Sequence, residues 1–313
     1  MFRISRLVTA ASLLTLSSLV APAASAAELK VVASFSIIAD LARNVGGDRV
    51  SVSMIVPVDG DAHTYEPKPA DAVALKDADV VLVNGLGLEG FLSRLIETSG
   101  TKAPVITVSK AVKPIKGEEE AHEEGEAEAG GEEHHHGAFD PHAWQSIKNG
   151  EAYVRAIATA FCKADKAGCE SYKTNEKAYL AKLVALDTEV RSQIAEIPKD
   201  KRIIITSHDA FGYFSKAYGL TFLAPEGIST EADASAADVA KLVDQVKADK
   251  ASAVFVENIT NPRLIEQIAS ETGLKVGGTL YSDALSPPDG PAATYIDMFH
   301  HNVATMKAAI LGR

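Results

Sequence analysis

The stretch SYKTNEKAYLAKLVALDTEVRSQIAEI, residues 171–197, contains neither glycine nor proline. Its apolar residues recur at the spacing of one helix face: Tyr172, Tyr179, Leu183, Leu186, Val190 and Ile194. At a rise of about 1.5 Å per residue, such a helix would be about 40 Å long. We therefore predict one long helix that runs the length of the molecule.

Apolar runs and helical patterns alternate on both sides of this helix. Before it, we predict strands at residues 29–35, 50–56, 80–84 and 105–108, and helices at 38–45, 70–76 and 149–161. After it, we predict strands at 202–206, 220–224, 253–256 and 276–279, and helices at 211–217, 236–248, 262–272 and 295–311. Nearly continuous apolar strands separated by helices indicate parallel sheets that are covered on both faces.

The two halves resemble each other. Ser34 and Val81 have the same separation as Ser207 and Val254, and each pair lies at corresponding predicted strands. The expected fold is therefore α/β, with two pseudo-symmetric lobes that are each a parallel sheet flanked by helices, joined by one long rigid helix. We expect the N-terminal lobe at residues 27–170, the linking helix at 171–197 and the C-terminal lobe at 198–313.

Residues 1–26 have the layout of a secretory signal peptide. Arg3 and Arg6 precede an apolar run that is too short for a membrane-spanning helix, and a small-residue cleavage site ends at Ala26. No cysteine stands near this site, which argues against a lipid anchor. We expect the mature chain to be exported to the periplasm.

Acidic residues dominate the charge, which is -11. Nine of the glutamates lie between Gly117 and Gly137, a tract with almost nothing apolar to bury, which predicts a mobile loop. The same tract holds four histidines that we interpret as an accessory site for metal capture: His122, His134, His135 and His136. The acidity argues against nucleic acid or an anionic membrane as a partner.

The two cysteines, Cys162 and Cys169, lie close together in sequence. In an exported protein such a pair most simply forms a disulfide that closes a small loop. The alternative is a thiolate pair on a metal ion, although no further cysteine exists to complete a soft site.

Outside the acidic tract, three histidines and one aspartate follow predicted strands, where α/β lobes carry their functional loops: His63, His142, His208 and Asp283. Each also has a structural interpretation when taken singly. His63 could belong to a turn, His142 could pack against Trp144, His208 could cap a helix, and Asp283 could be solvated. Their common position in a repeated fold favours one site between the lobes.

Three imidazoles and one carboxylate suit tetrahedral Zn²⁺, whereas Mn²⁺ and Mg²⁺ prefer more oxygen. With Asp283 as the fourth ligand, no coordination position remains for an activated water, which favours binding over catalysis. The common nucleotide-binding and hydrolase motifs are absent from the sequence.

The sequence resembles the metal-specific periplasmic solute-binding proteins of ABC importers, in the cluster A-I type, and within it the zinc branch. The resemblance covers nearly the whole mature chain and is carried by five segments: residues 31–40, 63–67, 140–144, 207–214 and 255–258. The most specific are Asp140-Pro141-His142 with Trp144, and Ser207-His208-Asp209-Ala210-Phe211.

This resemblance implies a metal between two lobes, held by His63, His142, His208 and Asp283. The manganese branch has a glutamate where His208 stands, which favours zinc. In some zinc members a water replaces the final carboxylate, and Ala284 departs from the proline that is common there. The acidic tract resembles the accessory metal-capturing segment of many zinc members.

The leading hypothesis is thus a monomeric periplasmic zinc receptor that delivers Zn²⁺ to an ABC permease in the inner membrane. A periplasmic zinc metallochaperone is a second candidate partner. Glu66, Asp140 and Asp209 are adjacent candidates for orienting the histidines. One alternative is a manganese or iron receptor on the same fold. Another is a zinc hydrolase that uses three histidines, a water and Asp283 as base.

Overall fold

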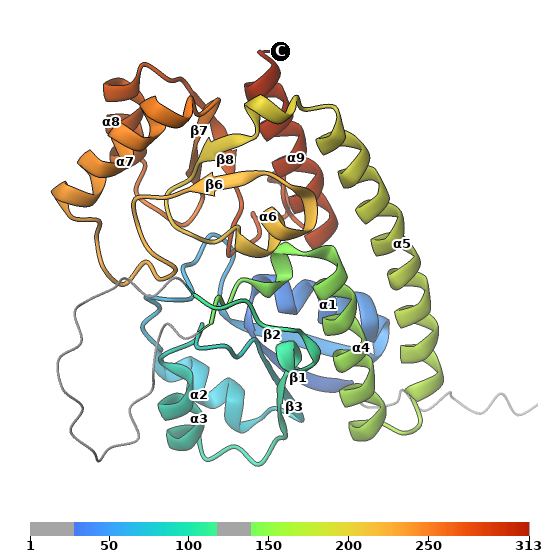
Figure 1. The fold of residues 1–313 in the computed structure, drawn as a ribbon. Coiled ribbons are helices and arrows are strands. Elements are labelled where there is room, and N and C mark those ends of the chain that lie inside the picture. Colours follow the sequence, from blue (N-terminus) through green and yellow to red (C-terminus); the bar gives the residue numbers. More distant parts are fainter. Residues whose placement is uncertain (1–27, 118–138, 313) are drawn as a thin grey trace, which may run out of the picture.

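The computed structural model describes residues 28–117 and 139–312 (Figure 1). The expected signal peptide and the four histidines of the acidic tract lie outside the described residues. Within the described residues, no helix combines the length and the apolar character that crossing a membrane requires.

The N-terminal lobe is a parallel sheet between helices. Its strands, in the spatial order β2-β1-β3-β4, are β1 (Leu29–Phe35), β2 (Val50–Val56), β3 (Val80–Val83) and β4 (Val105–Thr107). Its helices are α1 (Ser36–Gly46), α2 (Pro69–Lys76), α3 (Leu92–Ser99) and α4 (Ile147–Ala164). Helices α1 and α4 pack on one side of the sheet, and Figure 1 shows α2 and α3 together on the other.

The C-terminal lobe repeats this plan. Its parallel strands, in the order β6-β5-β7-β8, are β5 (Ile203–Ile205), β6 (Thr221–Leu223), β7 (Ala253–Glu257) and β8 (Val276–Leu280). Its helices are α6 (Gly212–Tyr218), α7 (Ala236–Asp249), α8 (Arg263–Thr272) and α9 (Tyr295–Leu311). The predicted α/β architecture of two similar lobes is therefore confirmed.

The strand register shows that the repeat is structural as well as sequential. Val32 pairs with Val81 in the first sheet, and Ile205 pairs with Val254 in the second. Both members of the second pair lie the same number of residues after those of the first. Residues that follow β3 and β7 can therefore be compared position by position.

Helix α5 (Cys169–Ala195) extends beside both lobes, as Figure 1 shows. It spans 27 residues and contacts α1 and α4 of the first lobe and α6 and α9 of the second. Its buried residues are the six apolar ones that predicted it, from Tyr172 to Ile194. The helix begins and ends two residues earlier than predicted, because the first turn starts at the cysteine.

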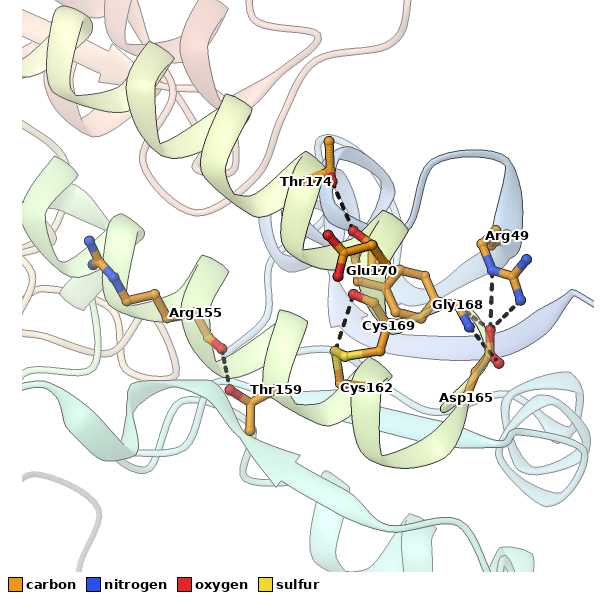
Figure 2. The surroundings of a disulfide bond; sticks show 10 residues. Arg49, Arg155, Thr159, Cys162, Asp165, Gly168, Cys169, Glu170 and Thr174 are labelled. Atoms are coloured by element: carbon orange, nitrogen blue, oxygen red, sulfur yellow. Dashed lines mark hydrogen bonds and ion pairs between the residues drawn. A yellow bond between two sulfur atoms is a disulfide. The ribbon is translucent and has the colours of Figure 1, made fainter.

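A disulfide between Cys162 and Cys169 joins the end of α4 to the start of α5, with the sulfurs 2.07 Å apart (Figure 2). The predicted disulfide is confirmed, and the thiolate metal pair is wrong. Next to it, Asp165 accepts hydrogen bonds from Arg49 at 2.7 Å and from the Tyr172 hydroxyl at 2.8 Å. The turn between the two helices is thus fixed by one covalent bond and one partly exposed ion pair.

Candidate metal centre

The loops at the carboxyl ends of the strands bring His63, His142, His208 and Asp283 together. His63 follows β2, His142 lies between β4 and α4, His208 follows β5 and Asp283 follows β8. One potential ligand atom from each residue lies within 4.8 Å of all the others. Each lobe therefore contributes two side chains to one cluster.

The separations within the cluster are short and similar. The Nε2 atoms of His63 and His142 are 3.2 Å apart. Asp283 Oδ2 lies 3.2 Å from His63 Nε2, 3.5 Å from His142 Nε2 and 3.3 Å from His208 Nε2. The carboxylate oxygen thus lies at a similar distance from all three imidazoles.

The cluster is buried between the lobes. His142, His208 and Asp283 have no exposed surface, whereas His63 retains 7%. His63 is therefore the ligand nearest to solvent, and its loop forms the outer edge of the site.

Asp140 orients His142. Its Oδ1 accepts the backbone N–H of His142 at 2.9 Å and lies 2.8 Å from Nδ1 of the ring. A Cβ on Gly212, at the start of α6, would come within 2.5 Å of Asp140 Oδ2, so the close approach of the second lobe requires glycine there. The Tyr213 hydroxyl donates to Asp140 O at 3.0 Å and holds the same turn from the second lobe.

Glu257, at the end of β7, contacts both the backbone and the ring of His208. Its Oε1 accepts the backbone N–H groups of Ser207 and His208 at 2.8 and 2.9 Å. Its Oε2 lies 2.7 Å from His208 Nδ1. This contact is an ion pair, and neither of the two atoms has a hydrogen-bond partner.

Asp61 anchors the third histidine through the backbone. Its Oδ1 accepts the N–H of His63 at 2.8 Å, and its Oδ2 accepts the hydroxyl of Thr64 at 2.9 Å. The same Oδ2 accepts the hydroxyl of Thr230, from the second lobe, at 2.5 Å. Every histidine of the cluster therefore donates its own N–H to a carboxylate.

The charges in the cluster stabilise the protonated forms of His142 and His208 and the ionised form of Asp283. Burial alone would lower the pKa of His142, but the charges of Asp283 and Asp140 outweigh it and raise the pKa to about 9. Burial would likewise lower the pKa of His208, but the charges of Glu257 and Asp283 outweigh it and raise this pKa well above the usual range. Burial would raise the pKa of Asp283, but His142 and His208 lower it well below the ordinary value.

The donor set fits a divalent cation. Both carboxylate oxygens of Asp283 are buried and have no hydrogen-bond partner, which is costly for an anionic group unless a cation compensates it. Three imidazoles that point Nε2 at such an oxygen supply nitrogen ligands of the kind that zinc and other borderline metals bind.

The sequence prediction placed these four residues in one site, and the structure brings them together. Of the predicted orienting residues, Asp140 does contact a histidine ring. Glu257 was not predicted for this role; the available signal was an acidic residue that ends an otherwise apolar strand. The predicted packing of His142 on Trp144 also occurs, with ring centroids 5.3 Å apart, so this contact and the cluster coexist.

Known proteins resemble this chain over most of its length. It is 36% identical to the manganese-binding lipoprotein MntA of Halalkalibacterium halodurans, over 90% of this chain and 88% of that protein. It is 32% identical to the iron-binding protein YfeA of Yersinia pestis, over 91% of this chain and 87% of that protein. The structure of the periplasmic zinc-binding protein TroA from Treponema pallidum superposes with a TM-score of 0.81 at 28% identity, covering 90% of this chain and 99% of that one.

Residues 31–309 match the family described as zinc-uptake complex component A, periplasmic. The match covers both lobes, the long helix and all four clustered residues. The chain therefore belongs to this family of metal-binding, non-enzymatic substrate-binding proteins of ABC importers.

Proposed function

We propose that this protein captures Zn²⁺ in the periplasm and delivers it to the membrane permease of an ABC importer. The observation that carries the proposal is the spacing of the donors. A tetrahedral Zn²⁺ with bonds of about 2.0–2.1 Å has neighbouring donors roughly 3.3–3.4 Å apart. The distances given above cover four of the six edges, three between Nε2 and Oδ2 atoms and one between two Nε2 atoms, and at 3.2 to 3.5 Å they agree with such a tetrahedron.

The kinds of donor support the same metal. Three nitrogens and one oxygen are typical of zinc, whereas Mn²⁺ favours octahedral, oxygen-rich sites. With the four positions filled by protein, no position remains for a reactive water, which suits retention of the ion. The hydrolase alternative is wrong, since the family consists of binding proteins.

A manganese or iron receptor is the second candidate, because MntA and YfeA are named for those metals. Affinity alone does not distinguish the candidates, because most nitrogen and oxygen sites bind zinc more tightly than manganese. The coordination number does distinguish them.

X-ray absorption at the metal edge of the zinc-loaded and manganese-loaded protein is the test. We expect four protein donors and no water around zinc, and a six-coordinate manganese that must recruit water. A zinc ion with two or more bound waters would contradict the proposal. In cells, loss of the gene should limit growth at scarce zinc, and added zinc should restore it where added manganese does not.

The remaining parts of the proposal rest on sequence. Residues 1–26 would direct export and be removed. His122, His134, His135 and His136 would raise the local zinc concentration or accept zinc from a metallochaperone. We propose that the protein acts as a monomer, with its site presented between the lobes.

A further inference from the structure

We propose that Glu257 is a positioning residue for the metal, holding His208 so that Nε2 presents its lone pair to the ion. This inference rests on the proposed metal-binding function. Glu257 is a buried acidic side chain that is not itself one of the proposed metal ligands.

The geometry assigns both oxygens of this carboxylate. Oε1 is occupied by the N–H groups of Ser207 and His208, which fixes the side chain against the loop. Oε2 then faces His208 Nδ1 at 2.7 Å. A carboxylate offers no proton and attracts an N–H group, so this ion-pair contact favours the tautomer in which Nδ1 carries the proton.

In that tautomer, the other ring nitrogen is free to bind a metal. Nε2 of His208 lies 3.3 Å from Asp283 Oδ2, inside the cluster. A carboxylate on the far nitrogen also makes the imidazole a more basic ligand. Glu257 is 1% exposed, so water does not compete for these contacts.

The internal repeat places a residue with a comparable task at the same position of the first lobe. Glu257 follows Val254 by three residues, and Asn84 follows the equivalent Val81 by three. Asn84 Nδ2 donates to Pro141 O at 2.9 Å and so holds the turn that carries His142. The same place in both lobes therefore supports a histidine-bearing loop.

The two lobes support their histidines with different sets of side chains. In the first lobe, Asp140 serves the ring of His142, and a neutral asparagine is sufficient to hold the turn. In the second lobe, Glu257 holds the loop and faces the ring at once. Only an anionic side chain with two acceptor oxygens can do both.

Glu257→Gln tests the proposal. The amide keeps the volume and can still accept the two backbone N–H groups, but it then turns its NH₂ toward Nδ1. That arrangement places the ring proton on Nε2, where the metal should bind. We expect zinc affinity to fall about 10–100-fold, measured by competition with a chromophoric chelator. Glu257→Asp, which keeps the carboxylate, should retain part of the affinity that Glu257→Gln loses.

Glu151→Gln is the matched control. Glu151 is equally buried, at 3% exposure, but its carboxylate pairs with Lys148 and Arg155 on α4. Its zinc affinity should equal that of the wild type. Unchanged affinity in Glu257→Gln, with normal zinc binding by the wild type, would overturn the inference and leave the proposed function standing.

A measurement on the wild type covers the case in which the variant does not fold. In the zinc-loaded protein with ¹⁵N-labelled histidine, we expect the NMR signals of His208 to show a protonated Nδ1 and a metal-bound Nε2. A proton on Nε2 of His208 would overturn the inference. Failure of the wild type to bind zinc at all would instead remove the proposed function.

Discussion

Trp144 Nε1 donates a 2.8 Å hydrogen bond to the carbonyl oxygen of Ser282. The donor lies two residues after His142 in the first lobe, and the acceptor lies directly before Asp283 in the second. Gln145 Nε2 donates to the same oxygen at 2.7 Å. Two side chains from one lobe therefore set the distance between a histidine and the carboxylate contributed by the other.

Trp144→Phe should weaken this connection while keeping an aromatic ring in the core. We expect a loss of about 1–2 kcal/mol in the free energy of unfolding and a roughly 3–10-fold loss of zinc affinity. Urea unfolding and chelator competition measure the two effects. Tyr172→Phe, which loses a hydrogen bond near the disulfide, should reduce stability without changing zinc affinity, and equal affinity losses in both variants would contradict the argument.

Alanine at His63, His142 or His208 should each reduce zinc affinity by more than the 10–100-fold that loss of an outer partner typically costs. Asp283→Ala should lose less, because water can take the place of one oxygen. Isothermal titration against a competing chelator gives the values. His301→Ala is the control, since His301 lies on α9 and contacts Thr279 O at 2.9 Å. Zinc binding by the triple histidine variant at wild-type affinity would refute the site.

Thr230→Val removes the hydroxyl that reaches Asp61 from the other lobe. Asp61 holds the backbone of His63, the most exposed member of the cluster, so this contact secures the outer edge of the site. We expect zinc to dissociate about 10-fold faster, equivalent to ~1.4 kcal/mol, with little change in the association rate. Thr188→Val, on the exposed face of α5, should leave the stopped-flow dissociation rate unchanged.

Asp40 should make stability depend on pH. Burial raises its pKa from 3.8 to about 6, although the Tyr295 N–H that it accepts lowers it. Between about pH 4 and 6 the folded protein thus holds a proton that the unfolded chain has lost, so stability falls as pH rises through this window. Asp40→Asn, which cannot ionise, should abolish that fall.

Urea unfolding of metal-free protein at pH 4, 5, 6 and 7 is the measurement. Asp48→Asn, on the exposed end of the same lobe, serves as the comparison. Parallel pH profiles for Asp40→Asn and the wild type would show that the buried carboxyl does not titrate in this range.

Replacing both cysteines by serine should destabilise the protein without affecting the metal. The disulfide closes a sequence separation of 7 residues, for which loop entropy predicts a loss of roughly 2.5 kcal/mol. The bond lies at the turn between α4 and α5 (Figure 2), and neither cysteine belongs to the cluster of possible metal ligands. A thermal shift on adding zinc that is as large as in the wild type would support this separation, and a lost shift would contradict it.

Long and uniform elements could be predicted from the sequence. Strands β1 and β2 and helix α9 have the bounds predicted, because the apolar residues recur along the whole length of each element. Helix α3 was missed. It has eight residues, follows a glycine-rich turn, and packs against α2, so its existence depends on tertiary contacts more than on local pattern.

The cluster itself could be predicted because three of its members follow strands closely, the fourth lies in the Asp140-Pro141-His142 motif before α4, and parallel strands present their carboxyl ends at one edge. The carboxylate that supports His208 could not be predicted in this way. Glu257 and His208 are 49 residues apart, while Asp209 is adjacent to the histidine and was the obvious candidate. The pairing of β5 with β7 is what brings this distant carboxylate beside the ring.

The even division of donors, two from each half of the chain, makes the cargo a cross-link. Neither half supplies enough donors to hold an ion alone, so the binding of the ion depends on how the two halves are placed relative to each other. A transporter that separates them by an ångström would break the coordination shell on both sides together, and would unload the ion without contacting any of its ligands.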